Sequence, residues 1–586
     1  MAKFFITNSQ KYYNSLKGQI AHTNFSLSFD YANNGVYALA THKLGMHNRN
    51  AVQVNEDFCV ATGTCIYKES LDYLPLLNDF DGDMSQIREN TIGQYAICVK
   101  KDNRLSVWGD ACGCYDIYYY NENGTWLISN SLYDIAEVIG HKLLPLNEFN
   151  VIVRMANRYI PNAQTFFDHI SYIRGEEYIN VDLQSSQFNI VKNKVDFPVG
   201  DDSFENLVTK AAEALKNNAR IAAKVLGTPT ICVTGGLDSR LVLASFLANG
   251  IKPHLFYGVG NNRITSPRKE DELCVEQLSK EFNLPIQKGD FFVSSPLDAD
   301  WNNYINDCGF TTAYMWGGQK NVIDSLRSGT DLLMFGWGGE LYRNISGWTE
   351  QKAEESITLH ELLSKWYIAR AQSAPLIREA IPDYDARVEQ EMRKECEHLG
   401  LNPERMSIDD SFFIEMKYRT MADTQIPSFI QYYKYAYLPL FEHNVLINRV
   451  HSNEKDFVKF MLALCSAIYH DILRVAFFTH QQWKTFDADS MSLRPAKSNY
   501  DRLSDSFFAK VLRVIAPKSI KQYIFRPLKR KLKANQKQPK LAPDCVINEF
   551  DTLNNAQYHI NMSDIRRSED TVMWAILLRA LKKLGY

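Results

Sequence analysis

The residues best suited to chemistry lie in one short turn, Thr234-Gly235-Gly236-Leu237-Asp238-Ser239. The glycines at 235 and 236 let the backbone come close to an anion, because no Cβ stands in the way. The hydroxyls of Thr234 and Ser239 can donate to phosphate oxygens, and the carboxylate of Asp238 can carry the Mg²⁺ that accompanies a nucleotide. These six residues therefore predict a site that holds a pyrophosphate group.

The elements around this turn are expected to place it at the start of a helix. Residues 230–233 form an apolar run typical of a buried strand, and the helical pattern that follows ends at Asn249-Gly250. The apolar face of that helix has helical spacing and consists of Leu241, Val242, Ala244, Leu247 and Ala248. At a helix N-terminus, unpaired backbone N–H groups and the positive end of the helix dipole attract phosphate. The alternative is a tight strand-to-helix connection with no ligand.

The alternation of strand and helix continues along the chain. Strands are predicted at 253–259 and 285–291, on either side of an amphipathic helix at 271–282, and a further strand is predicted at 331–335. This order predicts a doubly wound parallel α/β sheet. The last strand leads into a glycine-rich loop, Gly336-Trp337-Gly338-Gly339-Glu340-Leu341. Because the carboxyl ends of parallel strands meet at one edge, the two loops are expected to frame one crevice.

Five further residues are assigned to the nucleotide in this crevice. Gly258 and Val259 end the strand next to the first loop, and Gly336, Gly338 and Gly339 belong to the second loop. With the first turn, they make up the predicted binding site for ATP.

Lys497, which lies C-terminal to both glycine-rich segments in sequence, is a candidate catalytic residue. It follows Leu493-Arg494-Pro495-Ala496, a turn stiffened by proline, and a lysine there can neutralise pyrophosphate as it leaves. Taken alone, it is more typical of a solvated surface lysine. No lysine follows Gly236 in the manner of a Walker A motif, which argues against an NTPase that releases the γ-phosphate.

These motifs resemble those of the asparagine synthetase family, which also includes the β-lactam synthetases and the lasso-peptide cyclases. The turn at 234–239 is similar to the PP-loop of ATP pyrophosphatases, Ser-Gly-Gly-x-Asp-Ser, with Thr234 in place of the first serine. In the family, a Gly-x-Gly-x-Asp-Glu loop, a Pro-Phe-Leu-Asp tetrapeptide and an Arg-Pro-Lys segment follow in this order. Their counterparts here are 336–341, 439–442 and 494–497, and the resemblance covers nearly the whole chain.

The resemblance implies an activity and assigns roles. It implies that ATP, with Mg²⁺, is cleaved between its α- and β-phosphates, that AMP activates a carboxylate, and that ammonia or an amine then forms an amide. It makes Lys497 the lysine that contacts pyrophosphate, and it puts Glu340 where the family carries the loop aspartate. Asparagine synthesis from glutamine is the usual assignment in this family.

The second loop departs from the family pattern at two positions. Relatives carry a Glu or Tyr base between the first two glycines, where this chain has Trp337, and indole cannot act as a base at neutral pH. The acid after Glu340 is replaced by Leu341. Either Trp337 only packs against the loop, or the acceptor pocket has an aromatic wall suited to a sugar or peptide carboxylate. A non-catalytic nucleotide-binding protein or scaffold is the alternative function.

Residues 1–196 are expected to form a separate domain. Short alternating segments predict an antiparallel β-rich fold with a few helices, with strands at 26–31, 35–40, 58–66, 95–100, 105–109, 115–120 and 125–129. Gly93-Gln94-Tyr95-Ala96, Asp110 and Ser129-Asn130-Ser131 are similar to the glutamine amidotransferase domain of the family, an Ntn-hydrolase fold. Residues 197–586 are then the PP-loop domain, with a helical C-terminal part, so the fold class is α+β followed by α/β.

The expected glutaminase nucleophile is missing. An N-terminal nucleophile glutaminase needs a cysteine at position 2, where removal of Met exposes both the thiol and the α-amino group. This chain has Ala2. We therefore expect a retained scaffold with no glutaminase activity.

Composition limits the other function classes. A net charge of −3 argues against a nucleic-acid partner. The start of the chain lacks the pattern of a signal peptide, and no apolar run reaches transmembrane length, so a cytoplasmic protein is expected. The eleven cysteines suit free thiols, with Cys112-Gly113-Cys114 as a turn. Residues 518–540 hold nine basic and no acidic residues; they are typical of a solvated segment, with an anionic partner as the alternative.

Overall fold

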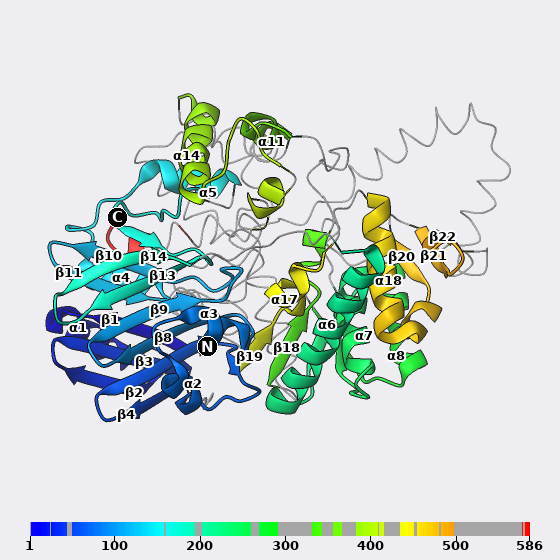
Figure 1. Cartoon of the computed structure of the whole chain (residues 1–586), viewed down its shortest axis with the longest axis horizontal. Helices are drawn as coiled ribbons and strands as arrows, with labels where there is room; N and C mark the ends of the chain where they lie inside the picture. Colours follow the sequence, from blue (N-terminus) through cyan, green and yellow to red (C-terminus); the bar gives the residue numbers. More distant parts are fainter. Residues whose placement is uncertain are drawn as a thin grey trace, which may run out of the picture.

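The chain folds into a half built on antiparallel sheets and a half built on a parallel sheet (Figure 1). The computed structural model describes residues 2–23, 25–43, 50–157, 160–193, 202–259, 269–290, 331–342, 356–365, 382–407, 409–414, 416, 434–449, 454–479, 482–496, 577 and 581–586. The predicted mixture of antiparallel sheets first and a parallel α/β sheet later is confirmed at this level. The predicted boundary at 196/197 lies outside the described residues, as do Lys497 and the basic segment 518–540.

Two six-stranded antiparallel sheets make up the N-terminal half. In sheet order, the first consists of β12 (Ile170–Tyr172), β10 (Tyr118–Glu122), β11 (Thr125–Ser129), β1 (Ala2–Thr7), β3 (Val36–Lys43) and β2 (Phe25–Asn33). The second consists of β14 (Gln187–Lys192), β13 (Glu177–Asp182), β9 (Arg104–Gly109), β8 (Tyr95–Lys101), β5 (Asp57–Gly63) and β4 (Ala51–Val54). β6 (Ile66–Tyr67) and β7 (Thr91–Ile92) form a short separate pair. The central strands β8 and β5 are buried on both faces, which is why they are apolar along most of their length.

Helices cover the outer face of each antiparallel sheet. α1 (Gln10–Ile20) and α4 (Leu132–Ile139) pack together against the first sheet. α2 (Leu74–Asp79) and α3 (Met84–Glu89) contribute to a second apolar cluster around Trp108 of β9, whose ring stacks on Phe80. α5 (Glu148–Asn157) follows α4. Figure 1 also shows the C-terminus on this half, near α4 and β10.

A five-stranded parallel sheet forms the centre of the second half. Its order is β17 (Ile286–Asp290), β16 (His254–Val259), β15 (Thr230–Cys232), β18 (Leu332–Phe335) and β19 (Tyr435–Tyr437), and every pairing is parallel. The connecting helices are α7 (Leu237–Leu247) and α8 (Lys269–Phe282). α6 (Phe204–Leu226), α7 and α18 (Glu454–Tyr469) pack against one another beside the sheet (Figure 1). The predicted strands and helix between 253 and 291 match β16, α8 and β17 to within two residues.

The remaining described elements lie between β18 and β19 or after β19 in sequence. They are η1 (Gly339–Tyr342), α11 (Leu359–Lys365), α14 (Tyr384–Leu399), η2 (Pro439–Phe441), α17 (His443–Leu446), η3 (His470–Arg474), and the three-stranded antiparallel sheet of β20 (Phe477–Thr479), β21 (Gln482–Asp487) and β22 (Ser492–Pro495). The described part of the C-terminal region, which was predicted to be helical, therefore contains strands as well as helices. Short apolar runs such as 435–437 have no periodicity long enough to separate strand from helix.

The two halves share one contiguous apolar core and several polar contacts. Phe5 of β1 and Leu243 of α7 belong to the same cluster of buried side chains. The guanidinium of Arg174, just before β13, pairs with the carboxylate of Glu395 in α14, and both side chains are buried. A buried pair of this kind fixes the position of its two elements, because a broken pair leaves an uncompensated charge.

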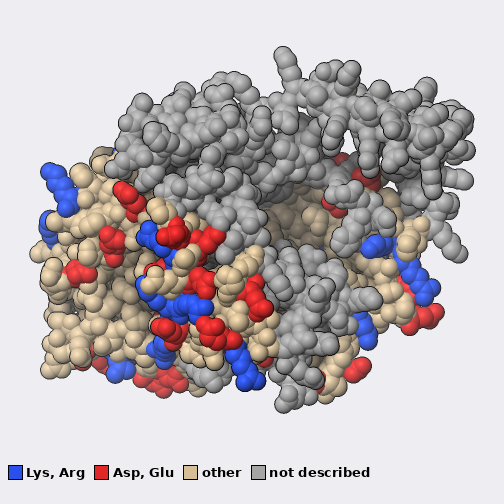
Figure 2. Space-filling model, turned by 90° about the horizontal axis from the view of Figure 1, so that it is seen from above, with Lys and Arg blue, Asp and Glu red and all other residues tan. Residues whose placement is uncertain are grey.

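Charged side chains of both signs are mixed on the surface of the described residues. On the face in Figure 2, acidic and basic side chains of the described residues are interspersed, with no large area of one sign. Among the described residues, no helix is long and apolar enough to cross a membrane.

Candidate functional site

The strand order of the parallel sheet reverses between β15 and β18, and the edge where their carboxyl ends meet is called the crevice below. The chain runs from β15 outward to β16 and β17 on one side, and then returns to β18 and β19 on the other. In such sheets, ligands bind outside the carboxyl ends of the strands at the point where the order reverses. The turn 234–239 follows β15, and the loop 336–341 follows β18, so both lie at this point.

The two loops are in direct contact, although they are about a hundred residues apart in sequence. A Cβ on Gly336 would lie 2.4 Å from the backbone nitrogen of Ser239. A Cβ on Gly339 would lie 2.3 Å from Oδ1 of Asp238. Only glycine fits at these two positions, so the second loop needs its glycines to pack on the start of α7.

The hydroxyl groups of the turn 234–239 accept hydrogen bonds from backbone N–H groups of the same turn. The backbone N–H of Thr234 donates to Oγ of Ser239 at 3.0 Å, and the N–H of Gly236 donates to Oγ1 of Thr234 at 3.3 Å. Ser239 is buried. These two hydroxyls thus help to shape the turn, whereas the sequence alone assigned them to phosphate binding.

The start of α7 has the character of an anion-binding site. Gly236 is the N-cap residue, with φ −79° and ψ −177°, and no side chain caps the helix there. Among the described residues, a Cβ on Gly236 would meet only Oγ1 of Thr234, at 3.4 Å. The described part of the chain thus leaves Gly236 uncrowded, and the N–H groups of the first helical turn and the helix dipole favour a negative charge.

A carboxylate that the sequence analysis missed already contacts this loop. The N–H of Gly235 donates to Oδ1 of Asp271 in the first turn of α8, at 3.1 Å. This carboxylate oxygen stands in for an anionic ligand at one N–H of the loop. The predicted helix at 271–282 was a usable signal, because a helix between two parallel strands must begin near the carboxyl edge of the sheet.

Arg240, the residue after the turn 234–239, fixes the position of α7. It is fully buried, and its guanidinium donates to the carbonyl oxygens of Val475 at 2.6 Å and Ala476 at 2.9 Å. It also stacks on the ring of Phe477, 3.6 Å from the centroid. Burial lowers its pKa to about 10, which still leaves it charged at neutral pH. The loop is thus tied to the segment that leads into β20.

The structure places three of the other predicted site residues and does not describe the side chains of two more. Gly258 and Val259 end β16, beside β15, where they pair with β17. Leu237 is buried in the core at the first position of α7. Glu340 lies in η1, but its side chain, like the whole of Lys497, is outside the described part of the structure.

The two departures from the family pattern both have packing roles. Trp337 is half-buried and stacks on Phe335 with ring centroids 4.6 Å apart and an angle of 14°. Leu341 is buried against the same core. Of the two interpretations of Trp337, this contact supports the packing indole.

The segment 438–442 connects the crevice with the N-terminal half. Gly338 has φ +92°, and a Cβ there would lie 2.8 Å from the ring of Phe441. The next residue, Glu442, accepts the N–H of Gly93 at 2.8 Å, and Gln94 exchanges hydrogen bonds with both the N–H and the carbonyl of Leu438. Gly93 and Gln94, which belong to the part of the chain that resembles an amidotransferase domain, thus form hydrogen bonds with the segment 438–442, and this segment packs against the second loop.

Buried acids at this junction have raised pKa values. Burial raises the pKa of the Glu442 carboxyl to about 8, against the lowering effect of the N–H of Gly93. Burial also raises the pKa of Asp110 to about 6, although Asp110 accepts the N–H groups of Cys112 and Cys114. The backbone N–H of Gly113 donates to the carbonyl of Asp110 at 3.0 Å, which closes a turn that includes Cys112. No metal-binding cluster of His, Cys, Asp or Glu occurs among the described residues.

The described donors suit a nucleotide-borne Mg²⁺. Such an ion is held by one or two carboxylates, waters and the phosphates themselves. Asp238, with its carboxylate against Gly339 at the mouth of the crevice, supplies one carboxylate. The open space at Gly236 leaves room for phosphate oxygens near it. The residues present are therefore compatible with a Mg²⁺–nucleotide complex.

Comparisons with known proteins add little beyond this geometry. No protein-family model and no curated protein matches the sequence. Among solved structures, the chain is similar to glutamine phosphoribosylpyrophosphate amidotransferase from B. subtilis complexed with ADP and GMP, with 8% identity and a TM-score of 0.21 over 57% of this chain and 81% of that chain. It is also similar to a structure described as the allosteric regulatory enzyme of purine biosynthesis, with 9% identity and a TM-score of 0.22 over 51% and 69%. TM-scores this low do not establish a shared fold.

Proposed function

We propose that this chain is an ATP-dependent, amide-forming ligase of the asparagine synthetase type. In this proposal, a carboxylate attacks the α-phosphate of ATP, pyrophosphate leaves, and ammonia or an amine displaces AMP from the activated carboxyl group. The observation that carries it is the meeting of the turn 234–239 with the loop 336–341 at the reversal point of a parallel sheet. Such a meeting supports a nucleotide site, because open backbone donors and an adjacent carboxylate suit Mg²⁺–pyrophosphate.

Each residue in the proposal has a definite part. The first turn of α7 and Gly236 receive the phosphates, and Asp238 holds Mg²⁺, which would screen the charge of the departing pyrophosphate. By resemblance, Lys497 contacts the same pyrophosphate, and Glu340 takes the place of the loop aspartate. Arg240 positions the loop without touching the ligand.

The acceptor half of the reaction is the part that differs from the family. A packed Trp337 cannot take a proton from the attacking amine, so the amine must arrive neutral or meet another base. We propose a carboxylate substrate with a sugar or peptide body, and ammonia or an amine as the nucleophile, with aspartate as the family's default.

For the N-terminal half, we propose an Ntn-type amidotransferase-like domain that no longer hydrolyses glutamine. Its two antiparallel sheets with helices on their outer faces are compatible with that fold. Ala2 begins β1 without a nucleophilic side chain. The contacts of Gly93 and Gln94 with 438–442 support a structural part in holding the second loop.

A second candidate is a nucleotide-binding protein without ligase activity. One observation favours it: Trp337 takes the place of the family's base and stacks on Phe335, and its indole cannot accept a proton at neutral pH.

The test is formation of AMP and pyrophosphate from Mg²⁺–ATP with candidate carboxylates, in the presence of ammonium. Asp238→Asn is expected to abolish AMP formation, whereas the matched control Asp331→Asn, an exposed residue at the opposite end of β18, is expected to retain it. Glutamine in place of ammonium is expected to give no product. If wild-type protein binds ATP but forms no AMP with any carboxylate, the ligase proposal fails and the second candidate replaces it.

A further inference from the structure

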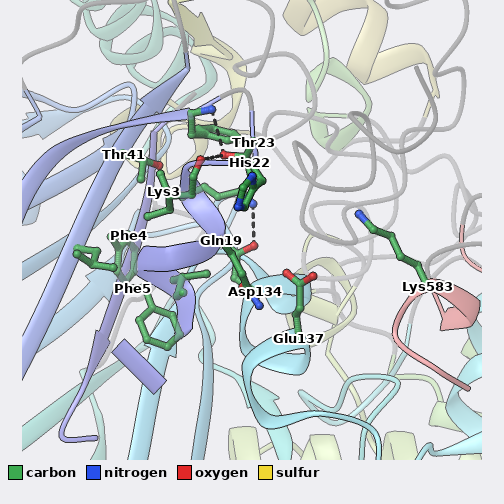
Figure 3. A pocket seen from close by; sticks show the side chains of 14 residues that line it. Lys3, Phe4, Phe5, Gln19, His22, Thr23, Thr41, Asp134, Glu137 and Lys583 are labelled. Carbon is green, nitrogen blue, oxygen red and sulfur yellow. Dashed lines mark hydrogen bonds and ion pairs between the residues drawn. The ribbon is translucent and has the colours of Figure 1, made fainter. Parts of the chain in front are cut away.

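The charged groups around a cavity of about 250 Å³ in the N-terminal half balance one another (Figure 3). Most of the residues that line this cavity belong to β1, β2, β3, α1 and α4. The ammonium of Lys3 pairs with the carboxylate of Asp134 at 2.9 Å, and the charges of Glu137 and Lys583 act on each other. Each of these two acids thus has a cation beside it. A buried carboxyl without such a cation lies elsewhere, in the segment 438–442.

Glu442 is this buried carboxyl. Its Oε1 accepts the backbone N–H of Gly93 at 2.8 Å, and among the described residues no basic side chain pairs with it. The charged group that acts on it is a second buried carboxyl, Asp110. Burial raises the pKa of the other titratable groups that face it, so that they are neutral at pH 7; these are Tyr95 of β8, Cys114 in the turn after β9, Tyr437 of β19 and Tyr342 of η1.

One cation is available for two carboxyls at this junction. Arg88 of α3 acts on Asp110, which leaves Glu442 without a counter-charge. A buried carboxyl in this situation takes up a proton, because a lone buried charge costs more than the neutral acid. Burial raises the pKa of Glu442 to about 8, although the N–H of Gly93 opposes this, and the charge of Asp110 adds to the rise. The carboxyl is therefore protonated at neutral pH.

The N-terminal half holds the main chain next to Glu442. β19 is the edge strand of the parallel sheet and lies beside this half (Figure 1). The backbone N–H of Leu438 donates to Oε1 of Gln94 at 2.8 Å. Side chains of the N-terminal half also donate to three carbonyl oxygens of the same stretch: Thr64 to Ala436 at 2.7 Å, Gln94 to Leu438 at 3.2 Å, and Cys112 to Phe441 at 2.8 Å. Glu442 is the member of this set whose charge changes near neutral pH.

The same segment supports the second glycine loop at two points. The ring of Phe441 lies 2.8 Å from the position that a Cβ on Gly338 would take. The hydroxyl of Tyr342, at the end of the loop, donates to the carbonyl of Leu440 at 3.0 Å. The loop itself packs on the start of α7. Because these groups are closely packed, a shift of 438–442 displaces the loop at the crevice.

We propose that Glu442 is a positioning residue, through which protonation in the contact between the two halves controls the nucleotide site. With the carboxyl protonated, the segment 438–442 stays against Gly93 and Gln94 and holds the loop 336–341 on the start of α7. Once ionised, the carboxylate repels Asp110, and the segment and the loop shift together. This regulation rests on the proposed function, since it acts on the proposed site for Mg²⁺–ATP.

The first test is the affinity for Mg²⁺ with an ATP analogue that resists cleavage, measured by calorimetry from pH 7 to pH 9. About a tenth of the carboxyl is ionised at pH 7 and about nine tenths at pH 9, so the dissociation constant of the wild type should rise about tenfold. Glu442→Gln keeps an oxygen for the N–H of Gly93 but cannot ionise, and its dissociation constant should change less than about twofold. The matched control is Glu148→Gln, an exposed carboxyl at the start of α5, which should follow the wild type.

Asp110→Asn tests the electrostatic part of the proposal. The change removes the negative charge that raises the pKa of Glu442, so the dissociation constant should begin to rise at a lower pH than in the wild type. A purely structural contact of Glu442 would not move the pH profile in this way. Asp110→Asn and Glu442→Gln are independent, so one of them remains decisive if the other does not fold.

Hydrogen exchange of the backbone at 336–342 tests the coupling without nucleotide. Wild type and Glu442→Gln are compared at the same pH, so that intrinsic exchange rates cancel. The two proteins should exchange equally at about pH 6.5, and the wild type should exchange at least about threefold faster at pH 9, because the loop is then less firmly held.

The possible failures are distinguishable. A constant dissociation constant of the wild type from pH 7 to pH 9, the same rise in Glu442→Gln, or equal exchange of the two proteins at pH 9 would overturn the role of Glu442 and leave the nucleotide site standing. Absence of analogue binding at pH 7, combined with faster exchange of the wild type at pH 9, would overturn the nucleotide site and leave the coupling of Glu442 to the loop standing.

Discussion

Replacing Gly236 by alanine should leave the fold of the turn 234–239 intact and weaken nucleotide binding there. The residue has φ −79° and ψ −177°, which any amino acid adopts, and among the described residues a Cβ would touch only Oγ1 of Thr234 at 3.4 Å. The change should therefore be tolerated by the fold. Alanine is a poorer N-cap than glycine but lowers the entropy of the unfolded chain, and these effects offset to within about 1 kcal/mol.

The effect on nucleotide binding should be much larger. The new methyl group would occupy the open space in front of α7, where the phosphates are proposed to lie. Loss of one charge-assisted hydrogen bond between the backbone and a phosphate costs about 1.5–3 kcal/mol. At about 1.4 kcal/mol per factor of ten, the dissociation constant for Mg²⁺–ATP should rise by about ten- to a hundredfold.

Calorimetry with an ATP analogue that resists cleavage between the α- and β-phosphates measures this change, and thermal unfolding measures the fold. Gly18→Ala in α1 is a matched control, because a Cβ there meets no atom within 4 Å and lies far from the crevice in sequence and fold. If Gly236→Ala binds the analogue as tightly as the wild type, the phosphates do not lie at the start of α7.

Three further perturbations address the surroundings of the site. Gly339→Ala places a methyl group 2.3 Å from the Asp238 carboxylate, so one of them must move by about 1 Å, and AMP formation should fall by about a hundredfold in steady-state assays while Gly18→Ala retains it. Arg240→Met leaves buried backbone carbonyls without their donor and should lower the free energy of unfolding by about 1–3 kcal/mol in urea titrations; an unchanged midpoint would contradict the anchoring role. Glu442 has a folded-state pKa of about 8, above its ordinary 4.5, so it is protonated in the folded state where the unfolded chain is ionised, and it removes stability as the pH rises from about 4.5 to about 8. Glu442→Gln should therefore gain in melting temperature relative to the wild type between pH 5 and pH 8, whereas parallel melting curves would show that this carboxyl does not titrate in that range.

The predicted elements around the site were largely correct where a local pattern was strong. The strand, turn and helix from 230 to 250 and the alternation up to 290 match β15, α7, β16, α8 and β17. Periodicity of apolar residues and the conformational freedom of glycine are properties of short segments, so they can be recognised in sequence. The short strands after 350 were missed because three apolar residues define no period.

The partners of the loop residues were less predictable. Asp271 was seen as the start of a helix, yet its carboxylate reaches Gly235. Arg240 was part of the motif, but its carbonyl partners lie more than two hundred residues further along the chain. Nothing in the local sequence specifies which distant carbonyl a buried guanidinium meets, because that depends on how α18 packs on α7 and on η3.

By itself, the sequence determined a glycine turn between a buried strand and a helix, a second glycine loop after another strand, and an N-terminal half without a nucleophile at Ala2. These follow from residue type and spacing within a few turns of chain. Only the tertiary structure decided that Gly339 presses against Asp238, that Glu442 ties the crevice to Gly93, and that Lys3 and Lys583 share a cavity. Such contacts join residues from distant parts of the chain, and strand order, register and helix packing alone bring them within bonding distance.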